Sequence, residues 1–247
     1  MFFKGNIWRK ASQKIIKHLN TLSDIEKGGI VVALSGGIDS VFLLTALTQL
    51  QRKYKYTLYP VYIQHNLIPE NDLYSKIAVL CAKKLGWDCA MFSIEPKPRK
   101  FNLEDWMRNE RYRLLEEYRK KVKADYLAVA HHEEDQAETV LAHIIRGCGL
   151  KGLSAMPFQR GPEPDGTGRD KIIRPIINVP KKDIYNLLRS TSLPYYEDKL
   201  NYSSDYQRNK IRHELLPYLR ENFNPQISAC LARLADAAKE VNDKHRG

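Results

Sequence analysis

A short loop at residues 35–40 carries the side chains of a phosphate site, with the sequence Ser35-Gly36-Gly37-Ile38-Asp39-Ser40. The apolar residues 30–34 before it predict a strand that is buried on both faces. The apolar run 41–47 after it predicts a buried helix. A strand, a tight loop and a helix direct backbone N–H groups and the positive helix end at one point, which is a site for a phosphate group.

Asp39 adds a metal ion to this prediction. The loop is not a Walker A loop, because no lysine follows Gly36 or Gly37. A carboxylate would repel phosphate unless a divalent cation lay between them, and Mg²⁺ accepts one or two carboxylates together with phosphate oxygens. The alternative is an ordinary turn in which Ser35 or Ser40 caps the helix. The complete string after a buried strand favours the phosphate site, with Asp39 holding Mg²⁺.

A second polar cluster, residues 131–139, follows another predicted strand at 126–130. Both clusters therefore belong to the carboxyl-terminal edge of the sheet, where open α/β folds bind ligands. On the helix that follows, Asp135 and Glu138 are three residues apart and project to the same side. Two such carboxylates can hold Mg²⁺ or an ammonium group. The alternative, acidic residues favoured by a helix N-terminus, accounts less well for His131, Asp135 and Glu138.

Arginines and a histidine complete the candidate set. Arg108 and Arg111 share one face of a predicted helix at 103–121, although exposed arginines of this kind are usually solvated. Arg212 lies in the first turns of a later helix. His65 follows the predicted strand 58–63, and it is either a ligand contact or an ordinary strand-end histidine.

The elements that must position these residues predict an α/β fold. Strands alternating with helices indicate a doubly wound, mainly parallel five-stranded sheet with a C-terminal helical segment. Pro175 interrupts the last strand and predicts that it lies at an edge. Pro180 is expected at the first position of the next helix. The predicted strands are residues 30–34, 58–63, 89–94, 126–130 and 172–177. The predicted helices are residues 7–20, 70–85, 103–121, 133–146, 180–188, 206–221 and 225–242, together with the one that begins after the loop.

The composition limits the class of protein. A hydrophobic fraction of 43% in 247 residues allows a substantial core, and no apolar run is long enough to cross a membrane. The net charge of +11 favours a polyanionic partner such as nucleic acid, although generic surface lysines would give the same value. The 4 cysteines form no CxxC pair, which suits the reducing cytoplasm and argues against a clustered metal site.

With these pieces in place, the sequence resembles the tRNA(Ile)-lysidine synthetases of the ATP-pyrophosphatase, or PP-loop, superfamily. The loop alone would identify the superfamily, and the later stretches identify the family. The matching stretches are SGGIDS at 35–40, RNERY at 108–112, HHEEDQAET at 131–139, RGCGLKGL at 146–153, IIRPI at 172–176, EDKLNY at 197–202 and RNKIRHELLP at 208–217.

The resemblance implies an adenine nucleotide α-hydrolase-like fold and a two-step reaction. ATP adenylates the C2 oxygen of the wobble cytidine in tRNA(Ile) with a CAU anticodon. The ε-amine of free L-lysine then attacks C2, and AMP departs. Residues 35–40 would bind pyrophosphate, Asp39 would hold Mg²⁺, and His65 and His131 would contribute to the nucleotide site.

The resemblance also assigns the remaining residues. Asp135 and Glu138 would receive the substrate lysine, while Arg111 and Arg212 would contact phosphate or the lysine carboxylate. Residues 1–190 would form the catalytic domain, and residues 191–247 a helical segment that completes the active site and contacts tRNA. Longer family members carry further C-terminal tRNA-binding domains, whereas this chain ends soon after its last predicted helix. A cytoplasmic homodimer is expected at the level of the family.

Three other functions are compatible with parts of the sequence. In a tRNA thiolase of the same superfamily, sulfur rather than lysine attacks the adenylate, but many thiolases use clustered cysteines. In an amidotransferase of this superfamily the substrate would be a small molecule, which the basic charge disfavours. A non-catalytic RNA-binding module would not need Asp39, Asp135 and Glu138 together.

Overall fold

The computed structural model describes residues 2–23, 25–64, 71–94, 103–160, 171–197 and 206–245. His65 lies outside the described residues, as does most of the stretch 197–202.

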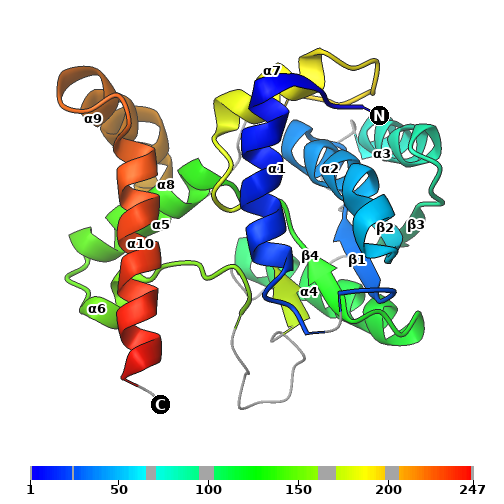
Figure 1. The fold of residues 1–247 in the computed structure, drawn as a ribbon, viewed down its shortest axis with the longest axis horizontal. Helices are drawn as coiled ribbons and strands as arrows, with labels where there is room; N and C mark the ends of the chain where they lie inside the picture. Colours follow the sequence, from blue (N-terminus) through cyan, green and yellow to red (C-terminus); the bar gives the residue numbers. More distant parts are fainter. Residues whose placement is uncertain are drawn as a thin grey trace.

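The sheet has five parallel strands in the order β3-β2-β1-β4-β5, which confirms the predicted architecture (Figure 1). β1 lies at the centre, where Ile30 pairs with Leu58 of β2 and with Tyr126 of β4. β2 and β3 are added on one side of β1, and β4 and β5 on the other. The strand order therefore reverses at β1, and folds of this kind bind ligands at the carboxyl end of the strand where that happens. The strands are Gly29–Ala33 (β1), Thr57–Gln64 (β2), Ala90–Ser93 (β3), Tyr126–Ala128 (β4) and Ile172–Ile173 (β5).

β5 is much shorter than the strand predicted at 172–177. It lies at the edge of the sheet, as Pro175 indicates, but only Ile172–Ile173 pair with β4. The chain then turns, with the N–H of Ile177 donating to the carbonyl of Arg174. The next helix begins one residue later than expected. Pro180 is its N-cap residue and not its first helical residue.

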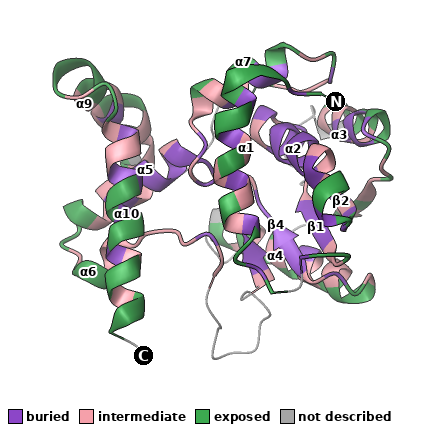
Figure 2. Cartoon of the chain, viewed as in Figure 1, coloured by how far each residue is buried: buried purple, intermediate pink, exposed green. Residues whose placement is uncertain are grey.

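Helices cover both faces of the sheet. One face packs against α1 (Gly5–Leu19), α2 (Ile38–Tyr54), α3 (Asn71–Lys84) and α7 (Lys181–Arg189), and the other against α4 (Leu103–Lys121). α1 buries residues at helical spacing, including Trp8, Ala11 and Ile15. α2 is buried on nearly all sides, as its apolar sequence predicts (Figure 2). The loop that precedes α2 is therefore held by the core on both of its flanks.

A second, helical body packs around α5 (Figure 1). Ala137 and Val140 of α5 share an apolar core with Ile211, Leu216 and Leu231. α5 begins beside the sheet edge and runs into this body, so its acidic N-terminal residues lie between the two. The body consists of α5 (Glu133–Ile145), α6 (Leu150–Leu153), α8 (Tyr206–Lys210), the π-helical turn η2 (Ile211–Leu215), α9 (Leu216–Asn222) and α10 (Ile227–Lys244). Within the described ranges, no helix is long and apolar enough to cross a membrane.

Candidate active site

The loop at residues 35–40 is held in a shape that needs glycine. Gly36 has φ +86°, and a Cβ there would lie 3.0 Å from the carbonyl oxygen of Tyr74 and 3.2 Å from Cε1 of Tyr196. The Oγ of Ser40 donates to the carbonyl of Gly37 at 2.8 Å. The loop is therefore closed internally, and the first N–H groups of α2, which have no acceptor within the helix, face the loop.

A cavity of about 250 Å³ opens beside the loop, against the ends of the central strands. Val61, Ile63, Leu115 and Val129 give it an apolar wall. Its polar lining comprises Ser35, Asp39, Ser40, Arg111, Tyr112 and His131. A wall of this kind suits the flat base of a nucleotide, and the loop next to it suits the phosphates.

His131 and Arg111 both line this cavity beside the loop; the sheet edge predicts this place for His131, whereas only the family resemblance implied it for Arg111. Arg111 is exposed on α4, and its guanidinium lies 5.7 Å from the centre of the Tyr112 ring. Burial lowers the pKa of His131 to about 3, so its imidazole is neutral at physiological pH. A neutral ring can accept or donate a hydrogen bond to a nucleotide without adding charge.

A second cavity, of about 400 Å³, lies on the other side of the same loop. Ser35, Gly37 and Asp39 line both cavities. The second cavity combines acidic and basic side chains, so it can hold a small molecule that carries both signs of charge. Its charged lining comprises Asp39, His132, Glu134, Asp135, Glu138, Lys181, Glu197, Arg212 and Arg220.

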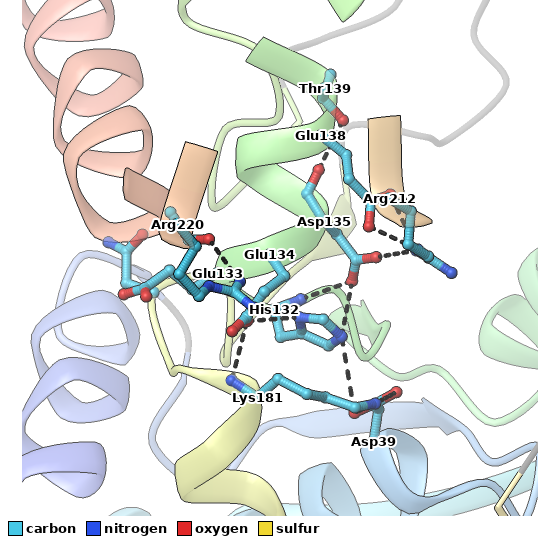
Figure 3. Close-up of polar contacts among 12 residues, drawn as sticks. Asp39, His132, Glu133, Glu134, Asp135, Glu138, Thr139, Lys181, Arg212 and Arg220 are labelled. Carbon is cyan, nitrogen blue, oxygen red and sulfur yellow. Dashed lines mark hydrogen bonds and ion pairs between the residues drawn. The ribbon is translucent and has the colours of Figure 1, made fainter. Parts of the chain in front are cut away.

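Arg212 bridges Asp135 and Glu138, two of the four carboxylates of α5 (Figure 3). Its Nε donates to Oε1 of Glu138 at 2.6 Å, and its Nη2 donates to Oδ1 of Asp135 at 3.0 Å. Arg208 adds a contact of 3.3 Å to the other oxygen of Glu138, which is only 2% exposed. Asp135 and Glu138 thus project to one side of α5, as their spacing predicts. The sequence did not predict that an arginine holds both.

His132, which the sequence analysis did not single out, lies among three carboxylates. Its Nδ1 is 3.3 Å from Glu134, and its Nε2 is 3.5 Å from Asp135 and 3.8 Å from Asp39. Burial would lower the pKa of His132, but these carboxylates outweigh burial and raise it to about 9. The sequence did contain a signal for His132, because successive side chains of an extended segment point to opposite sides. His131 accordingly lines the first cavity and His132 the second.

Lys181 is another residue that the sequence did not single out, as is Arg220, which lines the second cavity. Its Nζ donates to both carboxylate oxygens of Asp39, at 2.5 and 2.6 Å (Figure 3). Its backbone N–H donates to Oε2 of Glu134 at 2.9 Å. No local pattern could have found this pair, because the two residues are 142 positions apart.

The predicted Mg²⁺ site has a single carboxylate. Among the residues that the structure describes, no group of 3 or more His, Cys, Asp or Glu side chains could hold a metal ion by itself. Asp39 fits Mg²⁺ only as part of a set that substrate phosphate oxygens complete, which is the usual arrangement for this ion.

Comparisons with known proteins agree with this geometry. Residues 9–219 match the family model described as a PP-loop domain. The chain is 35% identical over 239 residues to the tRNA(Ile)-lysidine synthase of Clostridioides difficile (strain 630), covering 93% of this chain and 49% of that protein. It is 36% identical over 213 residues to the tRNA(Ile)-lysidine synthase of Azoarcus sp. (strain BH72), covering 85% and 46%. The chain therefore spans about half the length of these curated relatives.

Among solved structures, the chain is similar to the U34-tRNA thiolase NcsA from Methanococcus maripaludis, with a TM-score of 0.78 and 18% identity over 95% of this chain and 79% of that one. An NH3-dependent NAD synthetase from Campylobacter jejuni matches with a TM-score of 0.51 and 15% identity over 94% and 95% of the two chains. At these identities the likeness concerns the fold alone.

Proposed function

This chain belongs to the PP-loop domain family, and we propose that it ligates free L-lysine to C2 of the wobble cytidine of tRNA(Ile) with a CAU anticodon. ATP is consumed, and AMP and pyrophosphate are released. The observation that carries the proposal is the pair of cavities that share one phosphate loop, because each cavity suits one of the two small substrates. The relatives named tRNA(Ile)-lysidine synthase support the choice of substrates.

The first cavity receives ATP. The base lies against the apolar wall, and the phosphates lie on residues 35–40, where the N–H groups at the start of α2 bind them. Arg111 lines this cavity and can neutralise a phosphate. Asp39 would hold Mg²⁺ together with phosphate oxygens, and the ion would offset the charge of the departing pyrophosphate.

The second cavity receives lysine. The ε-ammonium of lysine binds the carboxylates of Asp135 and Glu138. Their oxygens keep lone pairs beyond those used by Arg212, by Arg208 and by the backbone N–H of His132. The α-carboxylate of lysine binds Arg212 or Arg220, which line the same cavity. Burial would raise the pKa of Asp135, but its neighbours, the protonated His132 first and Arg212 among the others, together outweigh burial and lower that pKa. Asp135 is therefore suited to hold the ammonium, and it is a weak base for removing its proton.

The helical segment completes this site. Arg208, Arg212 and Arg220 all come from residues 191–247, and the first two contact Glu138 of α5. We assign the tRNA contacts to this segment and to the surface lysine and arginine side chains that give the chain its net charge of +11.

A thiolase reaction is the second candidate, because the fold is shared with a tRNA thiolase. None of the described residues that line the two cavities is a cysteine. Burial raises the pKa of Cys81 to about 12 and that of Cys89 to about 11, so neither forms a thiolate readily. The site favours lysine over sulfur as the nucleophile.

The test is incubation of the full chain with ATP, labelled lysine and an unmodified tRNA(Ile) transcript bearing CAU. The expected result is ATP-dependent incorporation of lysine into the tRNA with release of AMP and pyrophosphate. The control is a transcript with another base at the wobble position. Equal incorporation of lysine without ATP, or no ATP-dependent product, would contradict the proposal.

A further inference from the structure

The phosphate loop lacks a lysine of its own, yet the tertiary structure brings one to it. A Walker A loop carries a lysine that reaches the phosphates, and none follows Gly36 or Gly37 here. Lys181, from the start of α7, instead extends its amine to Asp39 in the loop. Lys181 lines the second cavity, but Asp39 lines both cavities, so the amine lies at the part of the loop that the nucleotide cavity and the second cavity share.

Lys181 is held so that its amine can reach the loop and still move. α7 is anchored in the core by Ile184, Leu187 and Leu188, and the N–H of Lys181 is bound by Glu134. The side chain remains 26% exposed, and its Nζ lies 5.4 Å from the centre of the Tyr185 ring. The backbone is therefore fixed by several contacts, whereas the flexible side chain depends mainly on Asp39.

The charges around the loop would favour transfer of the Lys181 amine from Asp39 to a bound phosphate group. Asp39 is the acidic residue of the loop, and in the structure its carboxylate is paired with the Lys181 amine. Mg²⁺ held by Asp39 would give this carboxylate a second cation, and the oxygens of a bound phosphate group would then attract the Lys181 amine more strongly than Asp39 does. A partly exposed ion pair contributes little stability, so exchanging it costs little.

We propose that Lys181 is a further catalytic residue, which neutralises Asp39 in the resting site and binds the pyrophosphate group of ATP during adenylation. Lysine suits this role because it is a compact cation on a flexible stem. The inference rests on the proposed function only in taking ATP as the source of the phosphate.

The test compares Lys181→Gln with Lys182→Gln, its exposed neighbour on α7. Both substitutions remove one positive charge from the same turn. Titration calorimetry with Mg²⁺ and pyrophosphate, and separately with AMP, measures binding without any turnover. Lys181→Gln is expected to weaken pyrophosphate binding about tenfold or more, and to leave AMP affinity within about twofold. Lys182→Gln should leave both affinities unchanged, and Lys181→Arg should restore part of the pyrophosphate affinity.

A second measurement uses the wild-type chain, so it does not depend on the variant folding. Acetylation of the Lys181 amine by an activated ester, followed by mass spectrometry, should slow when Mg²⁺ and pyrophosphate are added and should not slow with AMP. Unchanged acetylation with pyrophosphate, equal pyrophosphate affinity in Lys181→Gln, or equal loss of both affinities would overturn the assignment. If the wild-type chain binds neither ATP nor pyrophosphate, the proposed function fails as well. If it binds both and only these comparisons fail, the error lies with Lys181.

Discussion

Arg212 binds Glu138 in a bidentate manner, because its Nε and Nη2 donate to the two carboxylate oxygens at 2.6 and 2.9 Å. The same Nη2 reaches Asp135. This fork joins η2 to α5 at the floor of the second cavity. The acidic pair is therefore both a candidate lysine site and a connection between the helical segment and the rest of the active site.

Glu138→Gln is expected to affect lysine before it affects ATP. The loss of a charge-assisted contact should raise the KM for lysine about ten- to a hundredfold, while the adenylated tRNA still forms. The loss of the buried ion pair should also lower the free energy of unfolding by about 1–3 kcal/mol. Single-turnover experiments that follow adenylated tRNA and lysidine separately test the first effect, and urea unfolding tests the second. Glu214→Gln, an exposed change on η2, is the control. Equal slowing of both steps with unchanged lysine dependence would assign Glu138 to the fold or to ATP.

Asp39→Asn should abolish adenylation and leave tRNA affinity nearly intact. In the proposed function this carboxylate holds Mg²⁺ at the phosphates, and loss of metal-assisted charge stabilisation costs several kcal/mol of barrier. The measurements are ATP-dependent pyrophosphate release and tRNA binding. Pyrophosphate release at the wild-type rate would remove Asp39 from this role.

Gly36→Ala should destabilise the loop at residues 35–40 by more than the positive backbone φ of Gly36 alone would cause. Gly36 and Gly86 have nearly equal φ, +86° and +84°, so alanine at either position has a strained backbone. Only at Gly36 would the new Cβ also meet other residues within 4 Å. Gly86→Ala should cost about 1 kcal/mol of unfolding free energy and leave ATP affinity unchanged. Gly36→Ala should cost more and weaken ATP binding. Equal losses in urea unfolding and unchanged ATP binding would show that the loop tolerates a side chain.

His132 should make stability depend on pH above neutrality. Its pKa is raised from 6.5 to about 9 in the folded chain. The charged imidazolium therefore stabilises the fold fully below pH 6.5, and this contribution is lost as the pH rises towards about 9. The difference in unfolding free energy between wild type and His132→Asn should shrink over that range. Urea titrations at several pH values measure it, with the exposed His213→Asn as control. A difference that stays constant with pH would mean that His132 is not charged in the fold.

The sequence by itself determined the central strand, the loop and helix after it, and the parallel sheet with β5 at its edge. Each of these depends on residues that are close along the chain: a buried apolar run, a pair of glycines, or a proline just after a short strand. The shared face of Asp135 and Glu138 was predictable for the same reason, because a helix repeats every few residues.

Only the tertiary structure decided which residues neutralise the site. Lys181 and Asp39 are 142 positions apart in the sequence, and Arg212 and Glu138 are 74 positions apart, so no local spacing predicts either pair. The placement of His132 opposite His131 depends on how β4 ends between the two cavities. The length of β5 likewise depended on the turn that leads into α7. Such contacts follow from the packing of α7 on the core and of the helical body on α5, and packing between distant segments leaves no periodic signal in the sequence.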